Sequence, residues 1–136
     1  MTELISAAAP EPVGPYPHAR RAGGFLFLSG MGPRRRGAKE IPGVTFGANG
    51  EVLAYDFAAQ CRATFANVAA VLEEAGSSLE KVVDVTVFIT DLGSDLATLN
   101  QIWTETFRSA RPTRTTVEVR RLPTPIAIEL KVIAEA

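Results

Sequence analysis

The sequence is poor in the residue types that build metal and redox centres. Its 136 residues include one cysteine, Cys61, and one histidine, His18. A single cysteine excludes an internal disulfide framework and any multi-cysteine zinc or iron–sulfur site within one chain. A single histidine likewise excludes a His-rich metal site and any chemistry that needs two histidines. The scarcity of cysteine favours a reducing compartment.

Long apolar runs and an excess of charge of one sign are lacking as well. No apolar run approaches the roughly 18 residues of a membrane span, and the first 19 residues lack a basic region followed by an apolar core. The 14 Lys and Arg residues almost balance the 15 Asp and Glu residues, which gives a formal net charge of -1. No global basic field is present to hold nucleic acid. We therefore expect a cytoplasmic protein that binds neither membrane nor nucleic acid.

What the sequence does contain is enough apolar material for a folded core. Hydrophobic residues make up 46% of the chain, so intrinsic disorder is not expected. The length predicts a single domain over residues 1–136, because a second domain would leave neither half a full core. Residues 1–19 carry four prolines and Gly14, which predict an extended or turning arm.

The spacing of apolar residues predicts two helices among several strands. One helix is capped by Asp56 and ends at Gly76, and a second is capped by Ser94 or Asp95 and ends before Arg111-Pro112. The expected strands are 25–28, 82–89, 115–121 and 126–133, with a further short strand near 44–46. This order predicts an α+β fold, a mixed sheet with two helices packed on one face. Strand 82–89 is expected to be covered on both faces.

Two charged residues near the end of the chain are candidates for chemistry. Arg114 stands at the start of a strand beside hydroxyl side chains, where a guanidinium can grip a carboxylate with two parallel hydrogen bonds. Glu129 interrupts an apolar alternation, so burial would raise its pKa toward that of a working acid or base. From the pattern alone, each could equally be structural: a strand-end arginine paired with an acid, and a solvated glutamate on a sheet face. That face has Ala127 and Ile133 around Glu129, so a partner subunit could cover it.

Other candidates lie near the N-terminus. Tyr16 and His18 sit on the stiffened arm, where they could line a pocket or simply cover the core. Ser29-Gly30-Met31-Gly32 lets a ligand approach backbone amides, although it lacks the lysine and the spacing of a phosphate loop. The run Arg34-Arg35-Arg36 is either a solvated loop or an anion anchor. Cys61 and Trp103 both fall on apolar helix stripes and are expected in the core.

Five segments along the chain form a recognisable set: GPYPHA, FLFLSG, AQCRATFANVAAVLEEAGSSLEKVVDVTVFITDL, PTRTTVEVRRLP and IAIELKVIA. Together they resemble the RidA/YjgF family of imine deaminases. The resemblance extends from about Gly14 to Ala134. It implies a chorismate-mutase-like α+β fold and a homotrimer with an active site in each cleft between adjacent subunits.

The resemblance also implies roles for individual residues. Arg114 would clamp the carboxylate of a small-molecule substrate, and Glu129 would position or activate water. The other pocket residues it implies are Tyr16, Gly30, Asn100 and Trp103, which leaves Trp103 divided between core and pocket. Thr116 stands where many members have a cysteine, and Met31 where many have a glutamine. Both departures point to a substrate other than the imine of 2-aminoacrylate.

Within the family, the chain looks closest to the 2-aminomuconate deaminase branch. That substrate is a dicarboxylate, so a second cationic group is needed besides Arg114; the candidates are His18 and the run Arg34, Arg35 and Arg36. The expected product is the 2-oxo acid 4-oxalocrotonate, formed with release of ammonia and with no metal or organic cofactor. If the last two strands formed a hairpin, Arg114 and Glu129 would be out of register by about 13 Å. A long substrate, a bent strand or a contribution from another chain could reconcile them.

Two other functions stay open at this point. One is a broad-specificity deaminase of 2-aminoacrylate and related 2-imino acids, which needs no second anion anchor. The other is a non-catalytic metabolite-binding module of the same fold. An RNA-cleaving role, sometimes attached to this family, is disfavoured by the near-neutral charge and the single histidine.

Overall fold

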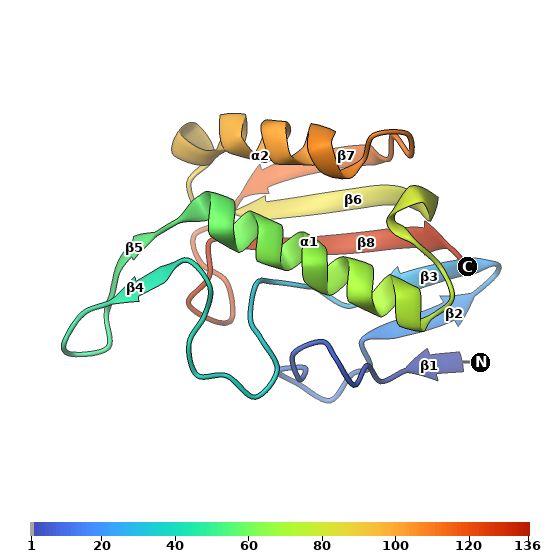
Figure 1. The fold of residues 1–136 in the computed structure, drawn as a ribbon, viewed down its shortest axis with the longest axis horizontal. Helices are drawn as coiled ribbons and strands as arrows, with labels where there is room; N and C mark the ends of the chain where they lie inside the picture. Colours follow the sequence, from blue (N-terminus) through green and yellow to red (C-terminus); the bar gives the residue numbers. More distant parts are fainter. Residues whose placement is uncertain (1) are drawn as a thin grey trace.

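The computed structural model describes residues 2–136, in which two helices lie on the same side of a six-stranded sheet (Figure 1). A separate two-stranded sheet, formed by β4 and β5, extends away from this body. The elements are β1 (Thr2–Leu4), β2 (Ala19–Ala22), β3 (Phe25–Leu28), β4 (Val44–Phe46), β5 (Val52–Tyr55), α1 (Phe57–Glu74), the 3-10 turn η1 (Leu79–Lys81), β6 (Val82–Ile89), α2 (Leu92–Thr106), β7 (Thr113–Glu118) and β8 (Ile128–Glu135). The predicted α+β class, with two helices on one face of a mixed sheet, is confirmed.

The main sheet has the strand order β1-β2-β3-β8-β6-β7. Strand β8 is antiparallel to both of its neighbours, whereas β6 and β7 run parallel and are joined by α2 as a crossover. The last two strands therefore form no hairpin, since β7 and β8 both pair with β6. Strand β7 also starts and ends earlier than predicted, because it spans Thr113–Glu118 and the prediction was 115–121. Residues 119–127 include Pro123 and Pro125, which cannot donate to a ladder, so they carry the chain across β6 as a connection.

The helix caps explain where the two helices begin. The Asp56 carboxylate accepts a hydrogen bond from the Ala59 amide at the start of α1, and Gly76 follows its end with a φ of 81°, as predicted. Helix α2 starts earlier than predicted, because Asp91 and not Ser94 or Asp95 is the cap: its Oδ1 accepts from the Ser94 amide. The helix also ends at Thr106, before the predicted stop.

The core lies between the helices and one face of the sheet. In β6, Val85, Val87 and Ile89 are fully buried, and their neighbours on β8 in register, such as Leu130 opposite Val87, are buried with them. The intervening residues Thr86 and Phe88 are half-buried on the other face. In a single chain the helices thus cover β6 on one face only, so the expectation of cover on both faces is wrong for the isolated chain.

The sheet face opposite the helices is unusually apolar for a surface. Phe25 and Phe27 on β3 are 41% and 39% exposed, and Val117 on β7 is 37% exposed. Half-buried Ile133 pairs with Phe27 across β3 and β8, and half-buried Lys131 lies two residues before it. We refer to these five residues as the open-face patch. Its composition agrees with the expectation that a partner subunit covers this face.

Candidate functional site

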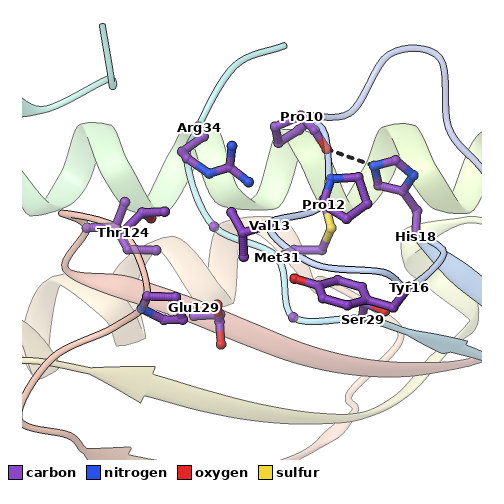
Figure 2. Close-up of a pocket in the computed structure, with 14 residues that line it drawn as sticks. Pro10, Pro12, Val13, Tyr16, His18, Ser29, Met31, Arg34, Thr124 and Glu129 are labelled. Carbon is purple, nitrogen blue, oxygen red and sulfur yellow. Dashed lines mark hydrogen bonds between the residues drawn. The ribbon is translucent and has the colours of Figure 1, made fainter. Parts of the chain in front are cut away.

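A pocket of about 480 Å³, part of it open to solvent, lies where β3 ends and β8 begins. Its walls come from three separate segments: the N-terminal arm, the stretch that follows β3, and the turn through Pro123 and Thr124 that leads into β8. Figure 2 shows Tyr16 and Val13 of the arm, Arg34, Thr124 and Glu129 around this space. Four of the residues singled out from the sequence, Tyr16, Gly30, Arg34 and Glu129, thus line one cavity, and His18 stands in its wall.

Glu129 is the acidic side chain of this pocket. It lies on β8 opposite Phe88 of β6, on the face away from the helices. Within residues 2–136 its carboxylate forms no hydrogen bond and no ion pair. Burial raises the pKa of Glu129, because the protein around it solvates the charged form less well than water does. A carboxyl group in this state can take up a proton more readily than an exposed one.

Gly30 has no side chain, and the Glu129 carboxyl occupies the space that a side chain there would fill. A Cβ atom at Gly30 would lie 2.9 Å from both Cδ and Oε2 of Glu129. No other residue type fits there unless the carboxyl moves, so glycine at this position is explained by close approach. The prediction that Gly30 belongs to the site agrees with this contact.

The backbone beside Glu129 departs from a regular ladder. Phe27 pairs with Ile133 and Met31 bridges Leu130. Between these two pairs, the segment that includes the end of β3 has one residue more than β8, as in a β-bulge. The Lys131 ammonium donates a hydrogen bond to the Leu28 carbonyl, which the irregularity takes out of the ladder. Within residues 2–136 the amide of Gly30 has no hydrogen-bond acceptor. A donor next to the Glu129 carboxyl is therefore free for a ligand.

His18 holds the arm in place and does not act as a cation. Its Nδ1 accepts a hydrogen bond from the Ser6 amide at 2.9 Å, and its Nε2 donates to the Pro10 carbonyl at 2.7 Å (Figure 2). A ring that accepts at one nitrogen and donates at the other is neutral. His18 is also 3% exposed. Its predicted role as a second carboxylate anchor is therefore wrong, and its effect on the pocket is to position the segment that carries Tyr16.

The arginine run after β3 is divided between the pocket and the arm. Arg34 lines the pocket, and its guanidinium donates to the Glu11 carbonyl at 2.8 Å. Arg36 donates to the carbonyls of Ser6 and Ala9 on the arm. Arg35 is exposed and lies outside the pocket wall, so the structure of one chain does not place Arg35 in the site.

Arg114 lies in a second group of candidate residues, away from the Glu129 pocket. Its guanidinium carbon stands 4.9 Å from the centre of the Trp103 ring on α2. On β7, Arg114 pairs with Val85, and so it faces the helix side of the sheet, opposite to the side that Glu129 faces. Burial lowers the pKa of Arg114, but a guanidinium stays protonated in water. Arg114 forms no ion pair within residues 2–136.

Thr116 and Asn100 accompany Arg114. Thr116 faces the same side of β7, and its hydroxyl is a buried polar group with no hydrogen-bond partner within residues 2–136. Asn100 is exposed on α2, three residues before Trp103. Trp103 itself makes edge contacts with Phe65 and a tilted contact with Phe107, so it serves both the core and the surface under Arg114. Arg114 and Glu129 thus share no cavity within one chain.

Other observations complete the site. Val13 and Thr124 in the pocket wall were not predicted; the only signal for the latter was the proline-rich turn around it.

Cys61 is fully buried, and burial raises the pKa of its thiol to about 12, which confirms it as a core residue. Among residues 2–136 there is no cluster of three His, Cys, Asp or Glu side chains suited to a metal ion. No helix in the same range is long and apolar enough to cross a membrane.

The chain is similar in sequence to proteins of one family over nearly its whole length. A family model described as Endoribonuclease L-PSP matches residues 6–136. A RutC family protein of Pyrococcus abyssi is 39% identical over 131 residues, which cover 96% of this chain and 94% of that protein. TdcF of Escherichia coli, named as a proposed reactive intermediate deaminase, is 35% identical over 129 residues, which cover 93% and 90%.

Solved structures show the same similarity in three dimensions. The crystal structure of Escherichia coli TdcF with bound serine superposes with a TM-score of 0.82 at 32% identity and covers 99% of each chain. RidA from an Antarctic Psychrobacter superposes with a TM-score of 0.84 at 30% identity and covers 100% of each chain. The fold of this chain is therefore the fold of these proteins.

Proposed function

Since the chain belongs to the Endoribonuclease L-PSP family, to which the RutC and RidA proteins are related, we propose that it is an enamine and imine deaminase whose substrate is 2-aminomuconate. One observation carries the proposal: within residues 2–136 Glu129 is unpaired and partly desolvated in a pocket, and it lies against Gly30, whose amide has no hydrogen-bond acceptor in that range. Hydrolysis of a C=N bond needs a group that accepts a proton and a hydrogen-bond donor for an oxygen or nitrogen atom of the substrate.

The proposed reaction begins with tautomerisation of the enamine to an imine. The protonated imine carbon is electrophilic, and water adds to it while the Glu129 carboxylate takes a proton from that water. A proton then passes to the nitrogen, the C–N bond breaks, and ammonia leaves with the bonding electron pair. The carbon is left as the carbonyl of the 2-oxo acid, which for 2-aminomuconate is 4-oxalocrotonate. The net change is addition of one water and loss of one ammonia.

A guanidinium is needed to hold the substrate carboxylate in this position. Arg114 of the same chain lies on the other side of the sheet, so it cannot serve the Glu129 pocket of its own subunit. We propose that the active assembly is a homotrimer in which the partner subunit's Arg114 completes each pocket. Two observations support an assembly: four of the five residues in the open-face patch are apolar, and within residues 2–136 both half-sites contain polar groups without hydrogen-bond partners. The role of Thr116, Asn100 and Trp103 would then be to shape the surface around that guanidinium.

Ammonia release from freshly generated 2-aminomuconate tests the proposal. Glu129→Gln should lose most of the turnover, because glutamine has the same shape but accepts no proton. Glu135→Gln, on the same strand and exposed, is the matched control and should keep it. Arg114→Lys retains the charge without the paired hydrogen bonds and should raise KM less than Arg114→Ala. Full activity of both Glu129→Gln and Arg114→Ala would refute the catalytic role.

Substrate breadth separates this proposal from its two alternatives. A broad-specificity deaminase would turn over 2-aminoacrylate as well as 2-aminomuconate, whereas the proposed enzyme prefers the dicarboxylate. A non-catalytic binding module would release no ammonia from either, and Glu129→Gln would leave its ligand affinity unchanged. RNA cleavage, which the family description names, is not proposed, because the single histidine is buried with both nitrogens engaged.

A further inference from the structure

A second cavity adjoins the Glu129 pocket at the turn before β8. It spans about 570 Å³, part of it open to solvent, and shares Pro123, Thr124 and Ile126 with the first. Its lining also includes Arg120 and Arg121, together with Tyr55, which comes from the β4–β5 sheet. A ligand can therefore extend from the Glu129 pocket over the shared turn into a cationic cavity.

The two arginines of this cavity are free. Both are exposed, and within residues 2–136 neither guanidinium forms a hydrogen bond or an ion pair. In the run Arg34 to Arg36, two of the three arginines are in a different state, because Arg34 and Arg36 donate hydrogen bonds to backbone carbonyls of the arm. The lining of this cavity includes both arginines and no acidic residue, so it attracts a carboxylate, to which a guanidinium can donate paired hydrogen bonds.

Arg120 and Arg121 lie at a position along the sheet that suits a ligand reacting at Glu129. The Val119 amide donates to the Ile89 carbonyl, and Ile89 pairs with Ile128, the residue before Glu129. The residues that follow Val119 thus leave the sheet at the edge where the Glu129 pocket opens. Arg114, in contrast, pairs with Val85, four residues before Ile89.

We propose that Arg120 and Arg121 bind the second carboxylate of a dicarboxylic substrate whose C–N bond reacts beside Glu129. The inference rests on the proposed function and names the residues that select its dicarboxylic substrate. In this proposal the phenol of Tyr55, which lines the same cavity, donates a further hydrogen bond to that carboxylate. This site replaces His18 and the run Arg34 to Arg36 as the second anion anchor.

Calorimetric titration with two unreactive probes tests the site without depending on catalysis. Muconate is a six-carbon dienoic acid with a carboxylate at each end, and sorbate is the same chain with one carboxylate and a methyl group. Wild-type protein should bind muconate about tenfold more tightly than sorbate, the amount expected of one charge-assisted contact. Arg120→Ala/Arg121→Ala should abolish this preference and leave sorbate affinity unchanged. Unchanged sorbate binding also shows that the pocket is still folded.

The matched control removes the same charge elsewhere. Lys39→Ala/Lys81→Ala takes two exposed cations from positions that line neither cavity, and it should keep the preference for muconate. The inference is overturned if wild-type protein does not prefer muconate, if the arginine variant keeps the preference, or if the lysine control loses it. Ammonia release by the wild-type enzyme is measured separately. If the wild-type enzyme releases no ammonia but its preference for muconate depends on both arginines, the proposed function is refuted and the anion site is supported.

Discussion

Substituting Gly30 by alanine separates the position of the Glu129 carboxyl from the stability of the fold. The new Cβ would lie 2.9 Å from Cδ of Glu129, whereas carbon atoms pack comfortably at about 3.5 Å. The carboxyl group must therefore move by roughly 0.6 Å, the difference between these two distances. Because it is the end of a flexible side chain, the move should cost at most about 1 kcal/mol of stability.

Activity should respond much more strongly than stability. A displacement of a reacting group by about 1 Å can reduce a rate about a hundredfold, so Gly30→Ala should lower kcat/KM for 2-aminomuconate by about tenfold to a hundredfold. The assay is steady-state ammonia release, read beside the melting temperature of the same sample. Gly93→Ala is the matched control, since its Cβ would meet no atom closer than 3.9 Å. Wild-type kcat/KM in Gly30→Ala would refute the argument that this contact sets the catalytic geometry.

Three further substitutions test other parts of the account. Burial raises the pKa of Glu129, so the folded state holds the carboxyl proton more tightly than the unfolded chain does. The free energy of unfolding therefore falls as the pH rises from the pKa of this group in the unfolded chain to its higher pKa in the folded state. Glu129→Gln should therefore raise the melting temperature near pH 8 but not near pH 4; an equal effect at both would contradict the assignment. His18→Ala removes two buried hydrogen bonds of the arm and should cost about 2 kcal/mol in urea unfolding; no loss would mean that the arm does not depend on it. Thr116→Val removes a buried hydroxyl without a partner and should leave stability within about 1 kcal/mol while raising KM; an unchanged KM would exclude Thr116 from the site.

The sequence predicts the elements of this fold better than it predicts their pairing. Helix α1 follows from its apolar spacing and from Asp56 and Gly76, which are local signals. The start of α2 was misplaced because Asp91, Ser94 and Asp95 are all good caps, and only the backbone geometry selects among them. The pairing of β7 with β6 could not be read from alternation, since that pattern records which face is buried and not which strand lies beside it.

For the site, the sequence predicted part of the grouping of the candidate residues. Glu129, Gly30 and Tyr16 meet in one pocket, as the family resemblance implied, although they lie far apart in the chain. His18 shows the limit of such reasoning, because a lone histidine on a stiff arm looks the same whether it binds a ligand or two backbone groups. The cationic cavity at Arg121 was missed because its residues come from a turn and a distant strand.

The central claim is that each active site combines Glu129 of one subunit with the partner subunit's Arg114. Mixing equal amounts of Glu129→Gln and Arg114→Ala, after dissociation and reassembly, measures it directly. Each variant alone should be inactive, but in random mixed trimers about a quarter of the interfaces would join an intact glutamate to an intact arginine. The account predicts about a quarter of the wild-type ammonia release from the mixture. A mixture that stays as inactive as its two components, although exchange of subunits is demonstrated, would contradict it.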